Sequence, residues 1–315
     1  MKYSNSFGKE SSKILLGTAY FGDTISEDSA FHIMDVYREM GGTHIDTARL
    51  YAGGESEKVV SRWFKSRKPQ NMRLSTKGAF PNPETPNVPR VNEKEIRHDL
   101  DLSLKALDVD SIEFYWLHRD DENQDAGEII EIMNSLVKEG KILRFGASNW
   151  RHQRVDRANS YAKEHGLQGF SGAQIRFSPA IISPDGNADR TLVDMSEEAF
   201  DYYKENNIPV AAYASQAKGF FSKMATIGES GLNVKSKERY LCEENLKRLD
   251  VIKALSEKYS ISVASTVCAS LINLENPDVY AIIGGSKPEQ IVDSMSGCDT
   301  TFEKNELEEI FKYKI

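Results

Sequence analysis

The chain has 315 residues, of which 39% are hydrophobic and 28% charged, and its formal net charge is −8. These values are typical of a globular protein large enough for one α/β barrel or two smaller domains. The acidic balance and the lack of a long basic run argue against nucleic acid as a partner. The longest apolar runs, such as residues 208–214, are too short to span a bilayer, and residues 1–13 are too polar for a secretory signal.

The three cysteines, Cys242, Cys268 and Cys298, are far apart in the sequence. Their odd number and wide separation favour reduced thiols over a disulfide framework, and their spacing does not suit a metal site. We therefore expect a cytoplasmic protein with no metal and no membrane partner. The sequence leaves the oligomeric state open.

Strand-like and helix-like patterns alternate along the whole chain. Eight short apolar runs predict strands at residues 13–17, 43–47, 73–77, 112–117, 142–147, 171–175, 209–214 and 279–283. Apolar residues at helical spacing predict helices at residues 27–40, 55–65, 92–107, 126–139, 155–164, 197–206, 244–258, 263–274, 288–295 and 303–313. A polar insertion at residues 219–240 fits either a lid or a simple loop.

This alternation, with no break in composition, predicts a single (β/α)8 barrel, an α/β TIM barrel that forms one domain over residues 1–315. The active site of such a barrel lies at the C-terminal ends of its strands. A doubly wound open sheet is the structural rival. No Gly-x-Gly-x-x-Gly motif follows the first predicted strand, so nothing in the sequence indicates a Rossmann site there.

Polar residues follow three consecutive predicted strands. Asp46 ends the second strand and is followed by Tyr51, while Lys77 ends the third strand and His118 the fourth. Taken singly, each has a structural explanation, such as a strand cap, a surface lysine, a core histidine or a packed ring. Because the ends of neighbouring strands meet at one rim of a barrel, the four together predict an acid–base site.

Four motifs carry a resemblance to a known family. They are Asp-Thr-Ala-x-x-Tyr-x-x-Gly-x-Ser-Glu at 46–57, Ser-Thr-Lys at 75–77, Leu-His-Arg-Asp-Asp at 117–121 and Gly-Lys-Ile-x-x-x-Gly-Ala-Ser-Asn-Trp at 140–150. In this order they resemble the aldo-keto reductase family over residues 14–294. The resemblance implies reversible hydride transfer between a nicotinamide cofactor and a carbonyl carbon.

The residue chemistry supports this reaction independently. Hydride addition leaves an alkoxide that needs a proton, and an isolated phenol, with a reference pKa of about 10, donates it reluctantly. A nearby ammonium favours the phenolate, a carboxylate keeps that ammonium charged, and a neutral imidazole can orient the carbonyl oxygen. We therefore assign Tyr51 as the proton donor and acceptor and Lys77 as the cation that favours its phenolate. Asp46 anchors Lys77, and His118 orients the carbonyl group.

The resemblance also implies the cofactor site. It places the nicotinamide carboxamide on Ser148, Asn149 and Gln174, stacks Tyr213 on the ring, and wraps the pyrophosphate in residues 215–219. Lys287 is the candidate for the adenosine 2′-phosphate, which favours NADPH over NADH; the alternative is a plain helix start. The expected cofactor-binding residues are Ser148, Asn149, Gln174, Tyr213, Ser215, Gln216, Ala217, Gly219, Gly285, Ser286, Lys287, Gln290 and Ser294.

The substrate is expected to be a small carbonyl or alcohol compound. The candidate pocket residues follow the strand ends and are Tyr20, Phe21, Arg49, Arg119, Asp120, Trp150 and Arg176. Arginine and aspartate make directional bonds to hydroxyl and acid groups, so a sugar, a keto-sugar or another polyhydroxylated or anionic molecule is predicted. The alternative is that these arginines pair with carboxylates in the loops.

The sequence alone is also compatible with two other functions. Lys77 could act as a Schiff-base nucleophile in an aldolase-type barrel enzyme. The chain could also be an NADPH-binding regulatory subunit, as in the potassium-channel β-subunits that resemble reductases.

Overall fold

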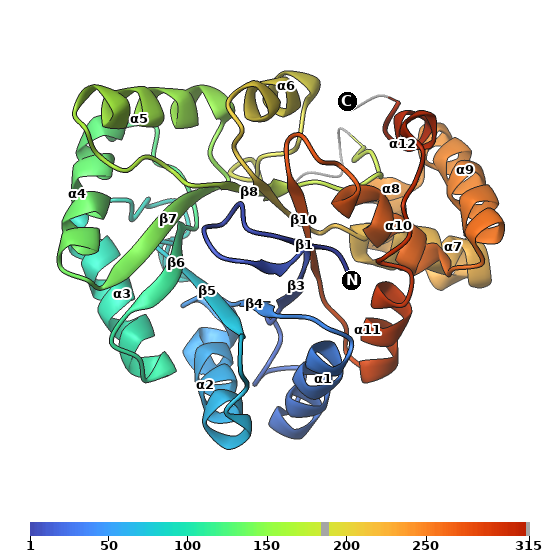
Figure 1. Ribbon diagram of the computed structural model, residues 1–315, viewed down its shortest axis with the longest axis horizontal. Helices are drawn as coiled ribbons and strands as arrows, with labels where there is room; N and C mark the ends of the chain where they lie inside the picture. Colours follow the sequence, from blue (N-terminus) through green and yellow to red (C-terminus); the bar gives the residue numbers. More distant parts are fainter. Residues whose placement is uncertain (184–188, 313–315) are drawn as a thin grey trace.

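A computed structural model describes residues 1–183 and 189–312. Eight parallel strands form a closed barrel in the order β10-β3-β4-β5-β6-β7-β8-β9, with helices around it (Figure 1). The barrel strands are β3 (Ile14–Gly17), β4 (His44–Asp46), β5 (Arg73–Gly78), β6 (Ile112–Leu117), β7 (Ile142–Ser148), β8 (Ala173–Arg176), β9 (Val210–Tyr213) and β10 (Val279–Ile283). The predicted (β/α)8 barrel is therefore confirmed.

The helices of the outer ring follow the strands along the chain. They are α1 (Glu27–Glu39), α2 (Glu55–Arg67), α3 (Glu93–Leu107), α4 (Ala126–Lys138), α5 (His152–Glu164), α6 (Glu197–Glu205), α9 (Glu243–Tyr259), α10 (Val263–Ile272), α11 (Pro288–Met295) and α12 (Lys304–Phe311). The predicted bounds of strands and helices agree with these to within three residues. The predicted last residue of the final helix, Tyr313, lies outside the described residues.

Local signals in the sequence explain where the helices begin and end. The Asn92 side chain accepts a hydrogen bond from the Glu95 backbone N–H at the start of α3 (3.1 Å), and Asp125 caps α4 in the same way. Just after α4, Gly140 has a φ of 74°, a left-handed conformation that glycine adopts readily. These caps fix the lengths of the helices and thus the placement of the strands that follow.

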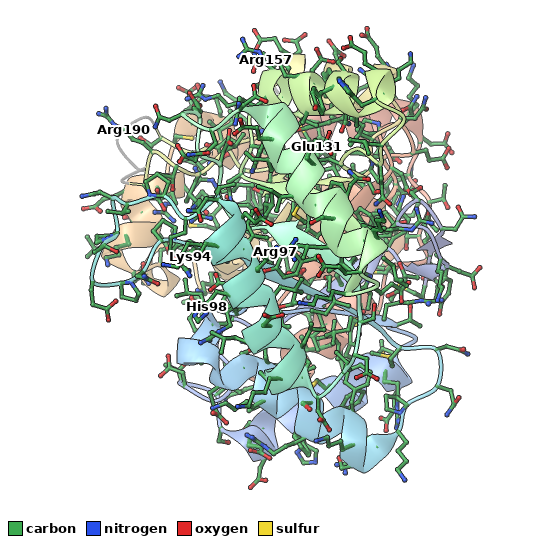
Figure 2. All side chains as sticks on the ribbon, turned by 90° about the vertical axis from the view of Figure 1, so that its left-hand side faces the viewer. Lys94, Arg97, His98, Glu131, Arg157 and Arg190 are labelled. Atoms are coloured by element: carbon green, nitrogen blue, oxygen red, sulfur yellow. The ribbon has the colours of Figure 1, made fainter. Side chains whose placement is uncertain are left out.

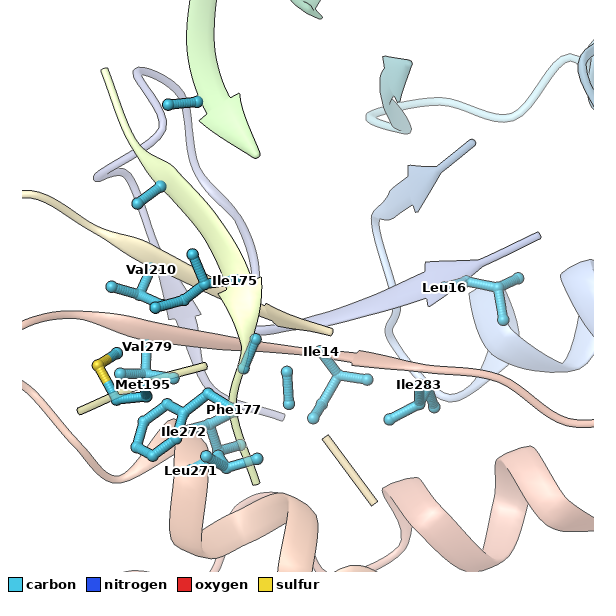
Figure 3. Packing of buried hydrophobic residues seen from close by; sticks show 14 of the residues in the cluster. Ile14, Leu16, Ile175, Phe177, Met195, Val210, Leu271, Ile272, Val279 and Ile283 are labelled. Carbon is cyan, nitrogen blue, oxygen red and sulfur yellow. The ribbon is translucent and has the colours of Figure 1, made fainter. Parts of the chain in front are cut away.

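Apolar side chains fill the layer between the strands and the helices. Figure 3 shows Ile14 and Leu16 of β3 in this layer, with Val210, Val279 and Ile283 of the neighbouring strands. All five are at most 2% exposed. Because side chains alternate along a strand, the residues between these point into the barrel, where the chemistry lies.

The inward-pointing positions change from apolar to polar along the barrel axis. On β6, Phe114 and Trp116 point inward, and His118 follows at the same parity just beyond the strand end. On β5, Ser75 and Lys77 take the equivalent places next to β6. The C-terminal rim is therefore lined by polar groups that rest on an apolar floor.

A short N-terminal hairpin closes the opposite end of the barrel. Strands β1 (Tyr3–Ser4) and β2 (Ser11–Ser12) pair antiparallel, and the ring of Phe7 between them lies 4.4 Å from the ring of Tyr280 and 5.2 Å from that of Phe114. This hairpin was not predicted from the sequence, because strands of two residues are too short to show an alternating pattern.

The insertion at residues 219–240 is mostly helical. It contains α7 (Phe220–Thr226) and α8 (Val234–Tyr240), with short 3-10 turns at Ala217–Gly219 and Glu229–Gly231. Phe220 and Phe221 are buried on α7, which contacts α9 and α10, and the buried ring of Tyr240 packs against Phe220. These contacts explain why this polar stretch folds onto the barrel.

Charged residues cover the outer faces of the helices. Figure 2 shows Lys94, Arg97 and His98 on α3 beside Glu131 on α4. Arg97 forms ion pairs with Glu93 on its own helix and with Glu139 beyond α4. No helix of the described residues has both the length and the apolar character that crossing a membrane requires.

Candidate active site

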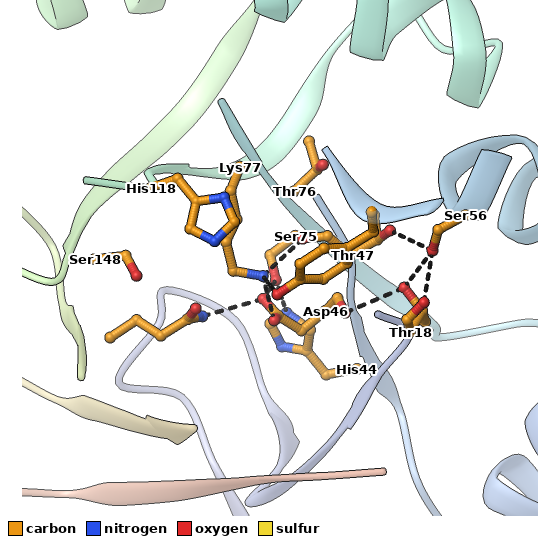
Figure 4. A network of polar contacts seen from close by, with 12 residues as sticks. Thr18, His44, Asp46, Thr47, Ser56, Ser75, Thr76, Lys77, His118 and Ser148 are labelled. Atoms are coloured by element: carbon orange, nitrogen blue, oxygen red, sulfur yellow. Dashed lines mark hydrogen bonds and ion pairs between the residues drawn. The ribbon is translucent and has the colours of Figure 1, made fainter. Parts of the chain in front are cut away.

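Lys77 lies at the centre of the polar rim. Its Nζ is 2.5 Å from Asp46 Oδ2, and it donates to the Thr47 carbonyl oxygen (2.7 Å) and to Tyr51 Oη (3.3 Å). Lys77 and Asp46 are 1% and 2% exposed, and Figure 4 shows them within one hydrogen-bonded network. The ammonium therefore touches both the carboxylate and the phenol, which is the contact that the sequence analysis required.

Tyr51 reaches this position because the chain turns sharply after β4. It begins the 3-10 turn Tyr51–Gly54, in which Ala52, Gly53 and Gly54 have φ values of 51°, 63° and 95°. Glycine adopts positive φ values readily, so Gly53 and Gly54 let the chain turn directly after Tyr51.

The ion pair determines the charge state of Lys77. Burial lowers the pKa of its ammonium, but the nearby charge of Asp46 and the hydrogen bonds to Asp46 and Tyr51 outweigh burial, and the net pKa is raised. Lys77 is therefore an ammonium at neutral pH. A Schiff-base nucleophile must be a free amine, so this geometry argues against the aldolase alternative.

His118 completes the group. Its ring lies 5.8 Å from that of Tyr51 and 4.9 Å from that of Phe80, in edge-to-face contacts. Burial, followed by the positive charges of Lys77 and Arg119, holds its pKa well below the ordinary value of 6.5. His118 is thus a neutral imidazole at the rim, as the orienting role requires.

Three residues that the sequence analysis did not assign to the catalytic group lie beneath it. Asp46 Oδ1 accepts hydrogen bonds from Ser75 Oγ (2.8 Å) and from Gln174 Nε2 (3.2 Å), and Ser75 Oγ lies 3.1 Å from His44 Nε2. His44 and Ser75 each lie two residues before a predicted catalytic residue on the same strand. The period of two in a strand was the signal that could have identified them.

The residues expected to bind the carboxamide lie beside the catalytic group. Ser148 and Gln174 occupy paired positions on β7 and β8, and both are buried. Asn149 Oδ1 accepts a hydrogen bond from the Tyr213 hydroxyl (2.6 Å) and another from the Val193 backbone N–H (3.2 Å). The four expected residues thus lie together on one side of the rim. The segment that carries Val193 also contacts this group, through Asn149.

The loop after β9 has an unusual backbone. Ala214, Ala217, Lys218 and Gly219 all have positive φ values, between 48° and 76°. Within this turn the backbone N–H groups of Ala217 and Gly219 donate to the carbonyl oxygens of Ala214 and Gln216 (both 2.8 Å). The Ser215 hydroxyl donates to the Ile282 carbonyl oxygen (2.6 Å), so its side chain stabilises the barrel and only its backbone is available.

The start of α11 faces this loop. The exposed residues Ser286 and Lys287 donate their backbone N–H groups to Gln290 Oε1 (2.7 and 3.2 Å). Gln216 Nε2 donates to Ser294 Oγ (2.9 Å) and so joins the loop to the helix. Gly285 lies against Gln290, since a Cβ on it would be 3.0 Å from Gln290 Oε1.

Most of the charged residues predicted for the pocket have partners within the chain. Arg176 forms a two-point ion pair with Asp194 (2.5 and 2.7 Å). Asp120 forms one with Arg154, which the sequence analysis did not single out. Arg119 donates to Thr191 Oγ1 (2.9 Å) and lies 3.4 Å from Asp189; burial is the largest influence on its pKa, which is lowered.

Two aromatic residues predicted for the pocket are core residues. Phe21 is 2% exposed and Trp150 is 0% exposed, and the Trp150 indole donates to the Arg119 carbonyl oxygen (3.0 Å). Both rings belong to the main hydrophobic core cluster, so in this structure they do not face solvent, and the prediction that they line a substrate pocket stays untested. Tyr20 is 56% exposed, and Arg49 borders a cavity of about 210 Å³ that Lys77 also lines.

A closed parallel barrel with a buried acid–base group at its C-terminal rim defines a barrel enzyme. Residues 13–314 match the model of the aldo/keto reductase family, and the chain belongs to that family. It is 26% identical over 306 residues to an aryl-alcohol dehydrogenase of Pestalotiopsis microspora, covering 94% of this chain and 76% of that protein. It is 27% identical to norsolorinic acid reductase B of Dothistroma septosporum, covering 95% and 77% of the two chains.

An uncharacterised oxidoreductase of Bacillus subtilis, YrpG, is 26% identical over 97% of this chain and 93% of its own length. Family membership and these relatives make the protein an oxidoreductase of a family that generally uses nicotinamide cofactors.

Proposed function

We propose that the protein is an NADP(H)-dependent oxidoreductase that interconverts a carbonyl compound and the corresponding alcohol. The observation that carries this proposal is the position of the Lys77 ammonium, which contacts both Asp46 and Tyr51. The ammonium favours a phenolate and so eases proton transfer through the Tyr51 hydroxyl. The charge of Asp46 holds the ammonium in place.

His118 orients the substrate in this proposal. Its neutral imidazole donates a hydrogen bond to the carbonyl oxygen near the Tyr51 hydroxyl, and so stabilises the negative charge that develops there. Phe80 packs against the imidazole and helps to exclude water from it. Tyr51 then protonates the oxygen during reduction and accepts the proton during oxidation.

A bound nicotinamide cofactor supplies the hydride. Ser148, Asn149 and Gln174 would hold its carboxamide, with Tyr213 against the ring and the positive-φ loop around the pyrophosphate. The polar groups beside the catalytic group fit such a molecule, and the tight turn of that loop follows directly after Tyr213. The exposed Lys287 and the start of α11 would take the 2′-phosphate, which favours NADPH over NADH.

We propose a polyhydroxylated or anionic carbonyl compound, such as a sugar, as the substrate. The part-buried Arg49, at the cavity beside Lys77, supports this class, because its guanidinium can bind hydroxyl or acid groups. The prediction of a polar substrate from the sequence also relied on Arg176 and Asp120. Both form ion pairs with other residues of the chain, so they support a polar substrate less strongly. Phe80 favours a second candidate, an aromatic carbonyl compound, in line with the name of one relative, the aryl-alcohol dehydrogenase.

Cofactor titration followed by turnover tests the reaction. NADPH and NADH are titrated while the tryptophan fluorescence is measured, and turnover is then compared between the native protein and Tyr51→Phe. We expect tighter binding of NADPH and loss of turnover by about 10²-fold or more in Tyr51→Phe, with binding retained. Binding without turnover in the native protein would instead indicate a regulatory subunit.

A substrate panel separates the two substrate classes. Aldoses and keto-sugars are compared with aromatic aldehydes by kcat/KM, in the native protein and in Arg49→Ala. We expect the polar compounds to be preferred and Arg49→Ala to raise their KM while leaving the aromatic compounds unaffected. A wide preference for the aromatic aldehydes would reject the sugar proposal and leave the reaction type intact.

A further inference from the structure

A row of hydrogen-bonded side chains runs downward from the catalytic group into the barrel. Below Lys77 it passes from Asp46 Oδ1 to Ser75 Oγ (2.8 Å) and from there to His44 Nε2 (3.1 Å). Figure 4 shows His44 and Ser75 beside the carboxylate of Asp46. His44 and Asp46 lie on β4 and Ser75 on β5, where Asp46 and Ser75 are register partners.

The direction of these hydrogen bonds follows from the charge of Asp46. A carboxylate has no proton to donate, so the single hydroxyl proton of Ser75 points to Asp46. Ser75 Oγ must then accept from His44, which requires the proton of a neutral imidazole on Nε2. The Nδ1 atom of His44 is left as a bare acceptor.

The surroundings of His44 agree with this tautomer. The side chain is 5% exposed, and within residues 1–183 and 189–312 its Nδ1 has no hydrogen-bond partner. A second proton on Nδ1 would therefore be buried without an acceptor. Burial, opposed by Asp46 and reinforced by the charges of Arg73 and Lys77, lowers the pKa of His44 to about 4.

We propose that His44 is a positioning residue for the catalytic group and that it acts through Ser75. By donating to Ser75 it fixes the hydroxyl as a donor to Asp46, which spreads the carboxylate charge and holds Oδ2 towards Lys77. More of the ammonium's charge is then available to favour the phenolate of Tyr51. This inference rests on the proposed function, because it concerns the acid–base step of that reaction.

The tautomer can be measured without cofactor or turnover. In protein labelled with ¹⁵N-histidine, the ring nitrogen shifts distinguish the two neutral tautomers, and loss of one signal set in His44→Gln assigns it among the six histidines. We expect His44 to be neutral with the proton on Nε2 from about pH 5 to pH 8. A proton on Nδ1, or a charged ring at about pH 7, would overturn the inference even if the protein has no enzymatic activity.

The kinetic test uses matched variants and the pH profile of alcohol oxidation. Ser75→Ala removes the donor to Asp46, His44→Met removes the donor to Ser75 at similar volume, and His44→Gln keeps an amide donor at a similar reach. We expect kcat to fall about tenfold in Ser75→Ala and about threefold in His44→Met, with His44→Gln near the native value. The half-maximal pH should rise by about half to one unit in the first two variants.

A double variant and a control complete the test. If His44 acts only through Ser75, His44→Met combined with Ser75→Ala should match Ser75→Ala alone. Ser12→Ala, which removes a buried hydroxyl at the other end of the barrel, should leave the profile unchanged. An unchanged profile in folded Ser75→Ala and His44→Met, or additive losses in the double variant, would contradict the proposal. Absence of turnover in the native protein would instead contradict the proposed function.

Discussion

Lys287 shows how a single exposed side chain can set cofactor preference. It lies at the start of α11, beside Ser286, with its ammonium exposed to solvent. A second phosphate on the adenosine ribose would find a cation and a helix N-terminus together there, whereas NADH carries no such group.

We therefore expect Lys287→Ala to weaken NADPH binding by about tenfold and to leave NADH binding nearly unchanged. Fluorescence titration of both cofactors at two salt concentrations measures this, and salt should reduce the difference. Lys304→Ala, on the exposed face of α12, is the matched control. Equal weakening of both cofactors would remove Lys287 from the 2′-phosphate site.

The two buried histidines of the site predict an acid-sensitive fold. His44 has a folded pKa of about 4 against an ordinary value of 6.5, and the pKa of His118 is also lowered well below 6.5. Between these values the unfolded chain binds protons that the folded chain does not, so stability falls as the pH falls below about 6.5.

For His44 alone this loss amounts to about 3 kcal/mol by about pH 4. We expect His44→Gln, which cannot titrate, to lose correspondingly less stability than the native protein between about pH 7 and pH 4.5. Urea denaturation at the two pH values measures the difference. Identical losses in both proteins would show that the imidazole is not held neutral.

At the scale of elements, an ion pair and several hydrogen bonds attach the end of the segment that follows β8 to the rim. The Arg176 backbone bonds to Val193 and Met195, and its buried guanidinium pairs with Asp194. Arg119 adds a hydrogen bond to Thr191. Loss of one of these contacts lowers the free-energy cost of local opening at this end of the segment.

Asp194→Asn should therefore loosen this segment, since it leaves Arg176 buried without its carboxylate partner. We expect trypsin to cleave after the exposed Arg190, labelled in Figure 2, about tenfold faster than in the native protein. Glu243→Gln, which removes the partner of the exposed Lys247, should not change the rate. An unchanged rate in Asp194→Asn would show that the ion pair does not hold the segment.

The order of the elements could be predicted because the barrel strands are continuous apolar runs and the helices have one apolar face. Helix α4 and strand β6 follow these templates closely, and their predicted bounds agree with the structure to within one residue. The β1–β2 hairpin and the helices α7 and α8 could not be predicted, because they depend on burial of a few aromatic residues such as Phe7 and Phe220 against distant parts of the chain.

The same distinction applies to the site. The positions of Asp46, Lys77 and His118 followed from strand ends that must meet at one rim. The pairing of Arg176 with Asp194 did not, because the stretch after β8 has no periodic pattern and its register depends on tertiary contacts. The sequence therefore predicts which side chains lie at the rim. It does not predict which of them form ion pairs with other residues of the chain.

At the scale of the whole molecule, the apolar floor of the barrel is completed by one residue that does not belong to a barrel strand. Phe7 is 4% exposed and its ring packs against Phe114 and Trp116 of β6 and Tyr280 of β10. Phe7→Ala should therefore destabilise the protein by about 3–5 kcal/mol.

Urea denaturation measures this loss, and Tyr3→Ala, on the exposed side of the hairpin, should cost no more than about 1 kcal/mol. Similar small losses for both variants would show that the hairpin only covers the barrel without closing it.

The ring of strands is completed where β10 pairs with both β3 and β9. During synthesis, β3 leaves the ribosome before the other seven barrel strands and β10 after them, so the nascent chain carries two unpaired strand edges until residue 283 has emerged. Closure of the barrel thus has to wait for residue 283, and the cell must keep these edges apart from those of other nascent chains until then.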